Sequence, residues 1–311
     1  MASTDTQAAI HQSQTRQGVL AGVLAFGMWG AFPIYFKIAT GVEALEMLAH
    51  RVAWAVPFGL LIILARKQWP DVKQILKTPR ILAWLCASAA FISLNWLVYI
   101  WAVQHNQVFQ ASLGYYINPL LLVWAGFVFL GERLRRNQGI AVGFACIGVS
   151  ILALSGGQVP WIALTLAVSF TVYGLVRKQV QVNAMPGLFV ETSILFPVAL
   201  AYLLYLLSSG DAAFGSNTRI SGLLLLAGPL TVLPLLFFAV SARRLSLATI
   251  GFLQFIGPSG QFLVGLYYEE PLTRAHLMCF GFIWLAVAIF VYDAIAENRR
   301  NNKASKPLMA H

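Results

Sequence analysis

The most regular feature of the chain is a succession of ten apolar segments separated by short polar gaps. The segments cover residues 18–38, 46–65, 81–103, 109–130, 138–155, 159–176, 188–207, 220–241, 247–268 and 276–295. Each approaches the ~20 residues that a helix needs to cross the hydrocarbon core of a bilayer. The runs are continuously apolar and do not alternate with a period of two, so they predict helices and not the strands of a barrel. We therefore expect an all-α integral membrane protein with ten transmembrane helices.

Basic residues gather in every second gap and in the two tails. The gaps after the second, fourth, sixth and eighth segments hold Arg66, Lys67, Lys73, Lys77, Arg80, Arg133, Arg135, Arg136, Arg177, Lys178, Arg243 and Arg244; the tails add Arg16, Arg299, Arg300, Lys303 and Lys306. The other gaps contain only Lys37, Arg219 and Arg274. Cytoplasmic loops of membrane proteins are enriched in Lys and Arg. The pattern predicts that both termini face the cytoplasm, an N-in/C-in topology.

Composition narrows the class further. The 311 residues are 59% apolar and 10% charged, whereas a soluble domain is about 25% charged. The net charge of +10 sits in short loops without interleaved aromatic residues, which favours contact with anionic lipid over nucleic acid. We expect the lipid bilayer as a partner and no nucleic acid, with residues 1–16 and 298–311 as disordered cytosolic tails.

The two halves of the chain resemble each other at offsets of 138 to 144 residues. The matching positions are Ala25–Gly30 with Ser169–Gly174, Pro57 with Pro197, Pro119 with Pro258, and Gly131–Leu134 with Glu269–Leu272. A unit of five spans is odd, so the second copy starts on the opposite side of the membrane. The sequence thus predicts two inverted-topology five-helix repeats, residues 17–155 and 156–297. Inverted repeats recur in secondary transporters, which hold the substrate near the midplane.

Two helix breaks are predicted near the middle of the membrane, at Asn118-Pro119 and at Gly257-Pro258. Proline removes a backbone donor and frees a carbonyl, which a bilayer tolerates only against protein or a wet cavity. A structural kink for packing is the alternative. Because the polar side chains of Asn118 and Gln254 accompany the breaks, we favour residues that line a substrate cavity.

Aromatic side chains at similar depth are candidates for the wall of that cavity. They are Trp29, Trp96, Tyr99, Tyr115, Tyr116 and Tyr173. Flat, amphipathic rings suit an amphiphilic solute, although packing or lipid contact is an equal alternative for each residue taken alone. Asn95 lies mid-membrane as well, and solute contact and an interhelical hydrogen bond are both open for it.

Intramembrane charge is expensive and marks functional candidates, here Arg51 and Glu191, with His50 as a weaker one. Arg51 and Glu191 lie six residues before Pro57 and Pro197. Inversion of the repeats separates them in depth by ~10 Å, so a direct ion pair is not favoured. One hypothesis is that Glu191 binds and releases a proton as coupling ion, since burial makes protonation of a carboxylate cheaper. The alternative, which we favour, is an ion pair with Arg177 or Lys178.

Four stretches closely resemble the RarD-type (chloramphenicol-sensitive protein) branch of the EamA family, in the drug/metabolite transporter superfamily. They are Ala111–Pro119, Asn95–Val103, Tyr173–Lys178 and Gly251–Pro258. The resemblance covers residues 17 to 298 and implies a ten-helix permease of the bacterial inner (plasma) membrane. It also implies efflux of small metabolites, amino acids or drugs, with the fifth and tenth helices at the periphery.

Three function classes are open to such a chain. A secondary transporter working by alternating access agrees with the spans, the repeat and the paired breaks. No Walker motif is present in the sequence to couple it to ATP. A membrane-embedded enzyme is disfavoured, because the five histidines form no metal-ligand spacing; we expect no metal and no cofactor. A passive channel or lipid scramblase is the third class. The expected partner is a small-molecule solute, and the sequence leaves monomer and homodimer open.

Overall fold

The computed structural model of the chain describes residues 2–130, 135–156, 159–242, 244–245, 250 and 253–304. All regular structure in these ranges is helical. The helices are α1 (Ala2–Ile38), α2 (Ala44–Ala65), α3 (Trp69–Leu76), α4 (Pro79–Gln104), α5 (Val108–Leu130), α6 (Arg136–Gly156), α7 (Trp161–Gln179), α8 (Ala184–Ser209), α9 (Thr218–Ala242), α11 (Ile256–Tyr267) and α12 (Arg274–Ala304). Several sequence features named above lie outside the described residues: Gly131–Leu134 with Arg133, Arg243, Gly251, Phe252 and Lys306.

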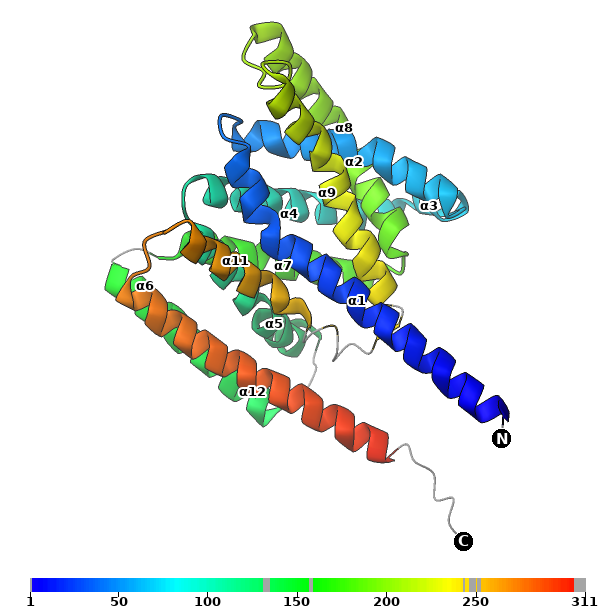
Figure 1. The fold of residues 1–311 in the computed structure, drawn as a ribbon, viewed down its shortest axis with the longest axis vertical. Helices are drawn as coiled ribbons and strands as arrows, with labels where there is room; N and C mark the ends of the chain where they lie inside the picture. The colour runs from blue at the N-terminus through cyan, green and yellow to red at the C-terminus, as the bar shows by residue number, and fades with distance from the viewer. Residues whose placement is uncertain are drawn as a thin grey trace.

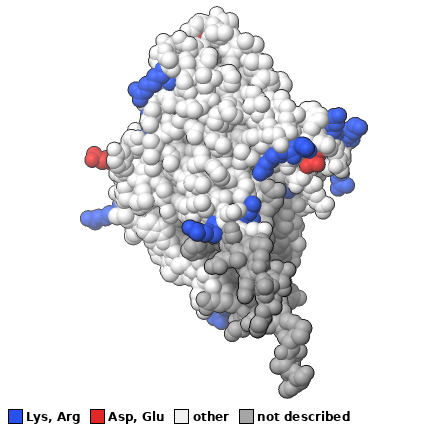
Figure 2. All heavy atoms as spheres, turned by 45° about the vertical axis from the view of Figure 1, so that its right-hand side comes forward, with Lys and Arg blue, Asp and Glu red and all other residues white. Residues whose placement is uncertain are grey.

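Within the described residues, seven helices are long and apolar enough to cross a membrane. They cover Gln14–Ile38, Ala44–Ala65, Pro79–Gln104, Arg136–Ser155, Ala184–Ser209, Thr218–Ser241 and Arg274–Asp293, and Trp161–Arg177 is a shorter apolar helix. Figure 2 shows a surface that is mostly uncharged, on which Lys, Arg, Asp and Glu form only small, scattered groups. Burying such a surface in lipid removes apolar area from water. The prediction of an all-α membrane protein is confirmed.

Helices in this structure also extend over parts of the chain that the sequence analysis assigned otherwise. Helix α3 lies within the basic gap after α2, where we predicted a loop. Its Val72 and Ile75 side chains are buried while Trp69 and Leu76 are exposed, so a short amphipathic helix packs beside the bundle. Helix α1 begins at Ala2 and α12 continues to Ala304, in segments for which we expected disordered tails.

The helices form one bundle with a peripheral pair (Figure 1). Helix α6 packs mainly on α12, and this pair lies along one side of the bundle. Helix α2 contacts α8 and α9, α1 contacts α9 and α11, and α7 contacts α4 and α5. Helix α5 also packs against α11. The interior is therefore bounded by α1, α2, α4, α5, α7, α9 and α11.

The two predicted midplane breaks differ in the structure. Helix α5 passes through Pro119 without interruption, whereas Phe255 forms a turn just before α11, so that Pro258 lies in the first helical turn. Proline is tolerated in a first turn because its missing N–H would have no intrahelical partner there. The ninth apolar segment is thus divided at Phe255, two residues before the predicted break at Gly257-Pro258, while the fourth segment keeps a continuous helix.

Candidate functional site

Helix α4 is joined to α7 and α5 through Asn95. Its Nδ2 donates to the Leu166 carbonyl and to Ser169 Oγ, at 3.0 Å each. Its Oδ1 accepts a 2.9 Å hydrogen bond from the Tyr115 hydroxyl. The side chain is 1% exposed. Three hydrogen bonds thus give Asn95 the interhelical role, one of the two considered for it, and solute contact stays a prediction.

Polar contacts also surround the predicted breaks. Asn118 Nδ2 donates to Thr171 Oγ1 at 3.0 Å. Ser112 Oγ donates to the Pro258 carbonyl at 2.8 Å, and the hydroxyls of Tyr116 and Ser259 are 2.7 Å apart. Helix α5 is therefore bonded to α7 on one side and to α11 on the other. Polar groups buried in the membrane interior are satisfied between helices.

Close approach of α1 and α11 depends on glycine. A Cβ on Gly30 would lie 3.1 Å from the Gly257 carbonyl oxygen, and a Cβ on Gly260 would lie 2.9 Å from Gly30 Cα. Small residues at such a crossing let two membrane helices pack backbone to backbone. Gly257 and Pro258 are both buried in this contact, so the second break is packed against protein and does not face lipid.

Arg51 is the most unusual side chain of the interior. It is 4% exposed, and its Nε donates to Thr231 Oγ1 on α9 at 3.1 Å. Its guanidinium carbon lies 4.6 Å from the centroid of the Trp96 ring, with Phe32 and Phe36 at 5.8 and 5.6 Å. Among the described residues no carboxylate pairs with it and its Nη1 has no hydrogen-bond partner. Glu46, five residues earlier in α2, accepts hydrogen bonds from the backbone N–H groups of Ala213 and Phe214 instead.

Three of the predicted aromatic residues gather around Arg51. The Trp96 ring stacks against it, and the Phe36 ring, which the guanidinium also approaches, lies 5.9 Å from the Tyr99 ring. The Tyr99 and Tyr115 rings are 5.6 Å apart, edge to face. Tyr99 is 4% exposed and its hydroxyl has no partner among the described residues. We call Arg51, Trp96, Tyr99 and Tyr115 the arginine cluster.

The other predicted aromatic residues lie in different surroundings. Tyr173 is linked to Tyr115 through Phe170, with centroid distances of 6.0 and 5.8 Å. Trp29 packs against Phe26 and Phe238, and Gln254 is partly buried just before α11.

Tyr116 does not join the arginine cluster. It packs with Phe255 and Phe280, because adjacent residues of a helix point about 100° apart. Tyr115 and Tyr116 therefore lie in different surroundings, and the structure does not bring them together.

Glu191 has the partner that the sequence favoured. Arg177 Nη1 lies 3.6 Å from its Oε1, and Ser88 Oγ of α4 donates to the same oxygen. Glu191 is 1% exposed. Gly187 leaves room for the Arg177 guanidinium, since a Cβ there would overlap it. Arg51 and Glu191 form no ion pair with each other, in agreement with their predicted difference in depth.

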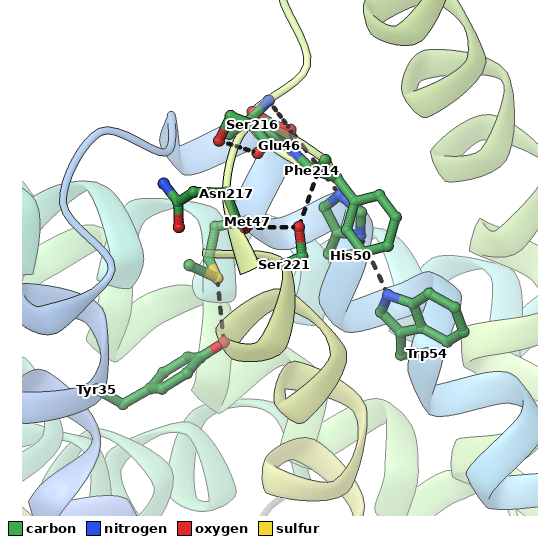
Figure 3. A network of polar contacts seen from close by, with 11 residues as sticks. Tyr35, Glu46, Met47, His50, Trp54, Phe214, Ser216, Asn217 and Ser221 are labelled. Atoms are coloured by element: carbon green, nitrogen blue, oxygen red, sulfur yellow. Dashed lines mark hydrogen bonds and ion pairs between the residues drawn. The ribbon is translucent and has the colours of Figure 1, made fainter. Parts of the chain in front are cut away.

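His50 belongs to a separate network at the beginning of α2 (Figure 3). Glu46 Oε1 accepts hydrogen bonds from the backbone N–H groups of Ala213 and Phe214 at 2.8 and 3.3 Å. The His50 ring lies 5.2 Å from that of Phe214, and its Nδ1 accepts a hydrogen bond from Trp54 Nε1. This network fixes the loop between α8 and α9 on α2, and nothing in the sequence pattern pairs these segments.

A second contact that the sequence analysis missed lies where α1 and α11 end and α5 begins. Lys37 Nζ is 2.9 Å from Glu270 Oε1 and 2.8 Å from Asn106 Oδ1. Glu270 Oε2 accepts a hydrogen bond from the Val108 N–H at 2.7 Å. The exposed fractions are 10% for the Lys37 side chain and 1% for that of Glu270. We call this group the Lys37–Glu270 latch; its members are far apart in sequence.

The described residues contain no group of three or more His, Cys, Asp or Glu side chains arranged to hold a metal ion. What the site offers instead is a single guanidinium, tyrosine hydroxyls and aromatic faces between helices. Such a surface can bind a solute non-covalently.

Comparison with known proteins agrees with this picture. The model of the EamA-like transporter family matches residues 16–154. Protein RarD of Salmonella typhi is 46% identical over 92% of this chain and 98% of its own length. Protein RarD of Escherichia coli is 45% identical over 93% and 99%. An uncharacterized transporter of Vibrio cholerae is 43% identical over 94% and 98%.

A solved crystal structure shares the fold, with a TM-score of 0.58 over 88% of this chain and 96% of that one, at 18% identity. The Vibrio cholerae relative bears the name of a transporter, and the helices are those of a multi-pass protein of the inner membrane. The chain therefore belongs to the EamA-like transporter family, as a member of its RarD-type branch.

Proposed function

We propose that this transporter moves small amphiphilic solutes out of the cell as a secondary transporter, by alternating access between two inverted five-helix repeats. The first repeat would comprise α1, α2, α4, α5 and α6, and the second α7, α8, α9, α11 and α12. The observation that carries the proposal is the set of contacts between helices. When each helix is replaced by its equivalent in the other half, the main contacts stay the same.

The recurrence covers every major contact. Helix α1 packs on α9 and α11. Its equivalent in the second half, α7, packs on α4 and α5, and these are the equivalents of α9 and α11. The α2–α9 contact corresponds to the α8–α4 contact, and α2–α8, α5–α11 and α6–α12 pair equivalent helices. An arrangement of this kind lets the two halves exchange conformations, which is the geometric basis of alternating access.

The intramembrane charges follow the same exchange. Arg51 of α2 bonds the Thr231 hydroxyl of α9, and Glu191 of α8 bonds the Ser88 hydroxyl of α4. Each residue is thus hydrogen-bonded to a helix of the opposite half, and these two helices, α9 and α4, are equivalents of each other. We assign Glu191 to its pair with Arg177 and leave it out of solute coupling, because its carboxylate already has a positive partner.

The ends of the chain support the N-in/C-in orientation. Helix α1 begins and α12 ends toward the same side of the bundle in Figure 1, in agreement with the basic residues of the cytosolic gaps. With that orientation, the Lys37–Glu270 latch lies on the outer side and joins the two halves. This supports a conformation closed toward the outside.

Counterflow in proteoliposomes tests the proposal. Vesicles preloaded with an unlabelled amphiphilic solute should accumulate the labelled solute transiently, with saturable kinetics and no chemical change. A passive channel or scramblase gives equilibration without trans-stimulation, and that result would refute alternating access. An altered product would point to an enzyme.

A further inference from the structure

The buried guanidinium of Arg51 has no counter-ion in the described part of the chain. A charge placed in a low-dielectric interior is ordinarily paired or neutralised, because its desolvation is otherwise uncompensated. Thr231 satisfies Nε with a neutral hydroxyl, which leaves the positive charge unbalanced. Stacking on Trp96 lowers the electrostatic cost, but an aromatic face is not an anion.

Two buried polar groups of the cluster have no hydrogen-bond partner among the described residues. They are Arg51 Nη1 and the Tyr99 hydroxyl. The two side chains flank the same ring, since Phe36 lies 5.6 Å from the guanidinium carbon and 5.9 Å from the Tyr99 ring. A planar guanidinium with free N–H groups matches the two oxygens of a carboxylate.

We propose that Arg51 and Tyr99 form a carboxylate subsite, so that the solutes of this transporter are amphiphilic carboxylates or zwitterions; the inference rests on the proposed transport function. The carboxylate lies against Arg51 Nη1 and the Tyr99 hydroxyl. Trp96 and Tyr115, which are both partly exposed, contact the apolar body of the solute. Phosphate esters fit less well, because Arg51 is the only cation that the structure describes in this cluster and a dianion needs more than one.

The other tyrosine hydroxyls near Arg51 already have hydrogen-bond partners in the protein. The Tyr115 hydroxyl donates to Asn95 and the Tyr35 hydroxyl donates to the Leu223 carbonyl at 2.8 Å, so both are committed to the protein. Tyr99 is therefore the hydroxyl beside Arg51 that is free to donate to a bound anion.

The test measures binding of matched solutes to the full-length protein. We use phenylacetate against phenylacetamide, and phenylalanine against phenylalaninamide, because each pair differs in the carboxylate and shares its ring. Affinity is read from thermal stabilisation in detergent and from counterflow in proteoliposomes. The native protein should bind each acid at least about ten-fold more tightly than its amide, since hydrogen bonds to charged groups are the stronger ones.

Three variants assign that preference to the cluster. Arg51→Gln should lower acid affinity about ten-fold or more and leave amide affinity within two-fold. Tyr99→Phe keeps the ring and should weaken acid binding about three-fold to ten-fold. Arg219→Gln, which removes an exposed basic side chain, is the matched control and should keep the native preference. If Arg51→Gln does not fold, Arg51→Lys takes its place, with a smaller loss because an ammonium lacks the planar fork.

The outcomes separate this inference from the proposed function. Equal affinity for acid and amide in the native protein overturns the carboxylate subsite, as does an acid preference that persists in both the Arg51 and Tyr99 variants. Saturable counterflow of the amides without any acid preference leaves transport in place and refutes the subsite alone. Failure of every solute in the panel to show counterflow contradicts both.

Discussion

Neutralising Lys37 should open the outer side of the transporter. In Lys37→Met the aliphatic chain is kept, but Glu270 loses its cation while 99% of its side chain stays buried. Breaking a buried ion pair by removal of one partner costs about 3–5 kcal/mol. We take about 3 kcal/mol, because the Val108 N–H still donates to Glu270. If the latch exists only in the outer-closed conformation, the equilibrium shifts toward opening by about 100-fold.

The assay is labelling of a cysteine at position 96 by a membrane-impermeant maleimide added to intact cells. This cysteine is introduced into a cysteine-free variant, in which Cys86, Cys146 and Cys279 are replaced. Labelling should accelerate by up to about 100-fold in Lys37→Met. Glu270→Gln should have a weaker effect, because Lys37 is nearer the surface and its ammonium can reach water.

Arg274→Met is the matched control, since Arg274 is exposed at the start of α12. It should leave the labelling rate unchanged. A labelling rate in Lys37→Met within two-fold of the native rate would refute the reasoning that the latch closes the outer side.

Three further predictions concern packing and coupling. Asn95→Ala removes three hydrogen bonds between helices and should lower the free energy of unfolding by about 1–3 kcal/mol, measured by thermal denaturation in detergent; unchanged stability would contradict the interhelical role. Gly228→Val should prevent folding or expression, because a Cβ at Gly228 would lie 2.5 Å from the Trp54 carbonyl oxygen. Gly222→Val should be tolerated, because a Cβ at Gly222 would meet open space. Similar yields of the two variants would argue against the α2–α9 contact. Glu191→Gln should lower the free energy of unfolding by about 1–3 kcal/mol. Transport by this variant should depend on an imposed pH gradient to the same extent as transport by the native protein. Selective loss of that dependence would restore Glu191 as a coupling residue.

The helices were predictable from the sequence because each requires only a long apolar run, and their bounds depend on where polar residues begin. Segments 46–65 and 81–103, for example, correspond to α2 at Ala44–Ala65 and α4 at Pro79–Gln104. Helix α3 was missed because it is short and amphipathic, and lies among basic residues that favoured a loop.

The candidate site was predictable only in part. Intramembrane charge singled out Arg51 and Glu191, and the partner of Glu191 followed from the basic gap that contains Arg177. The different surroundings of Tyr115 and Tyr116 could not be predicted, because hydropathy gives the depth of a residue and not the direction in which it points around its helix. The partners of Lys37 and Glu46 depend on which helix ends meet, and this is a property of tertiary packing.

The most direct test of alternating access is to tie the latch shut. Cysteines placed at positions 37 and 270 in the cysteine-free background can be joined by a short, reversible methanethiosulfonate cross-linker and assayed for counterflow in proteoliposomes. We predict that cross-linking abolishes counterflow and that reduction restores it, because outer opening requires these ends to separate. Full counterflow in the cross-linked protein would contradict the account.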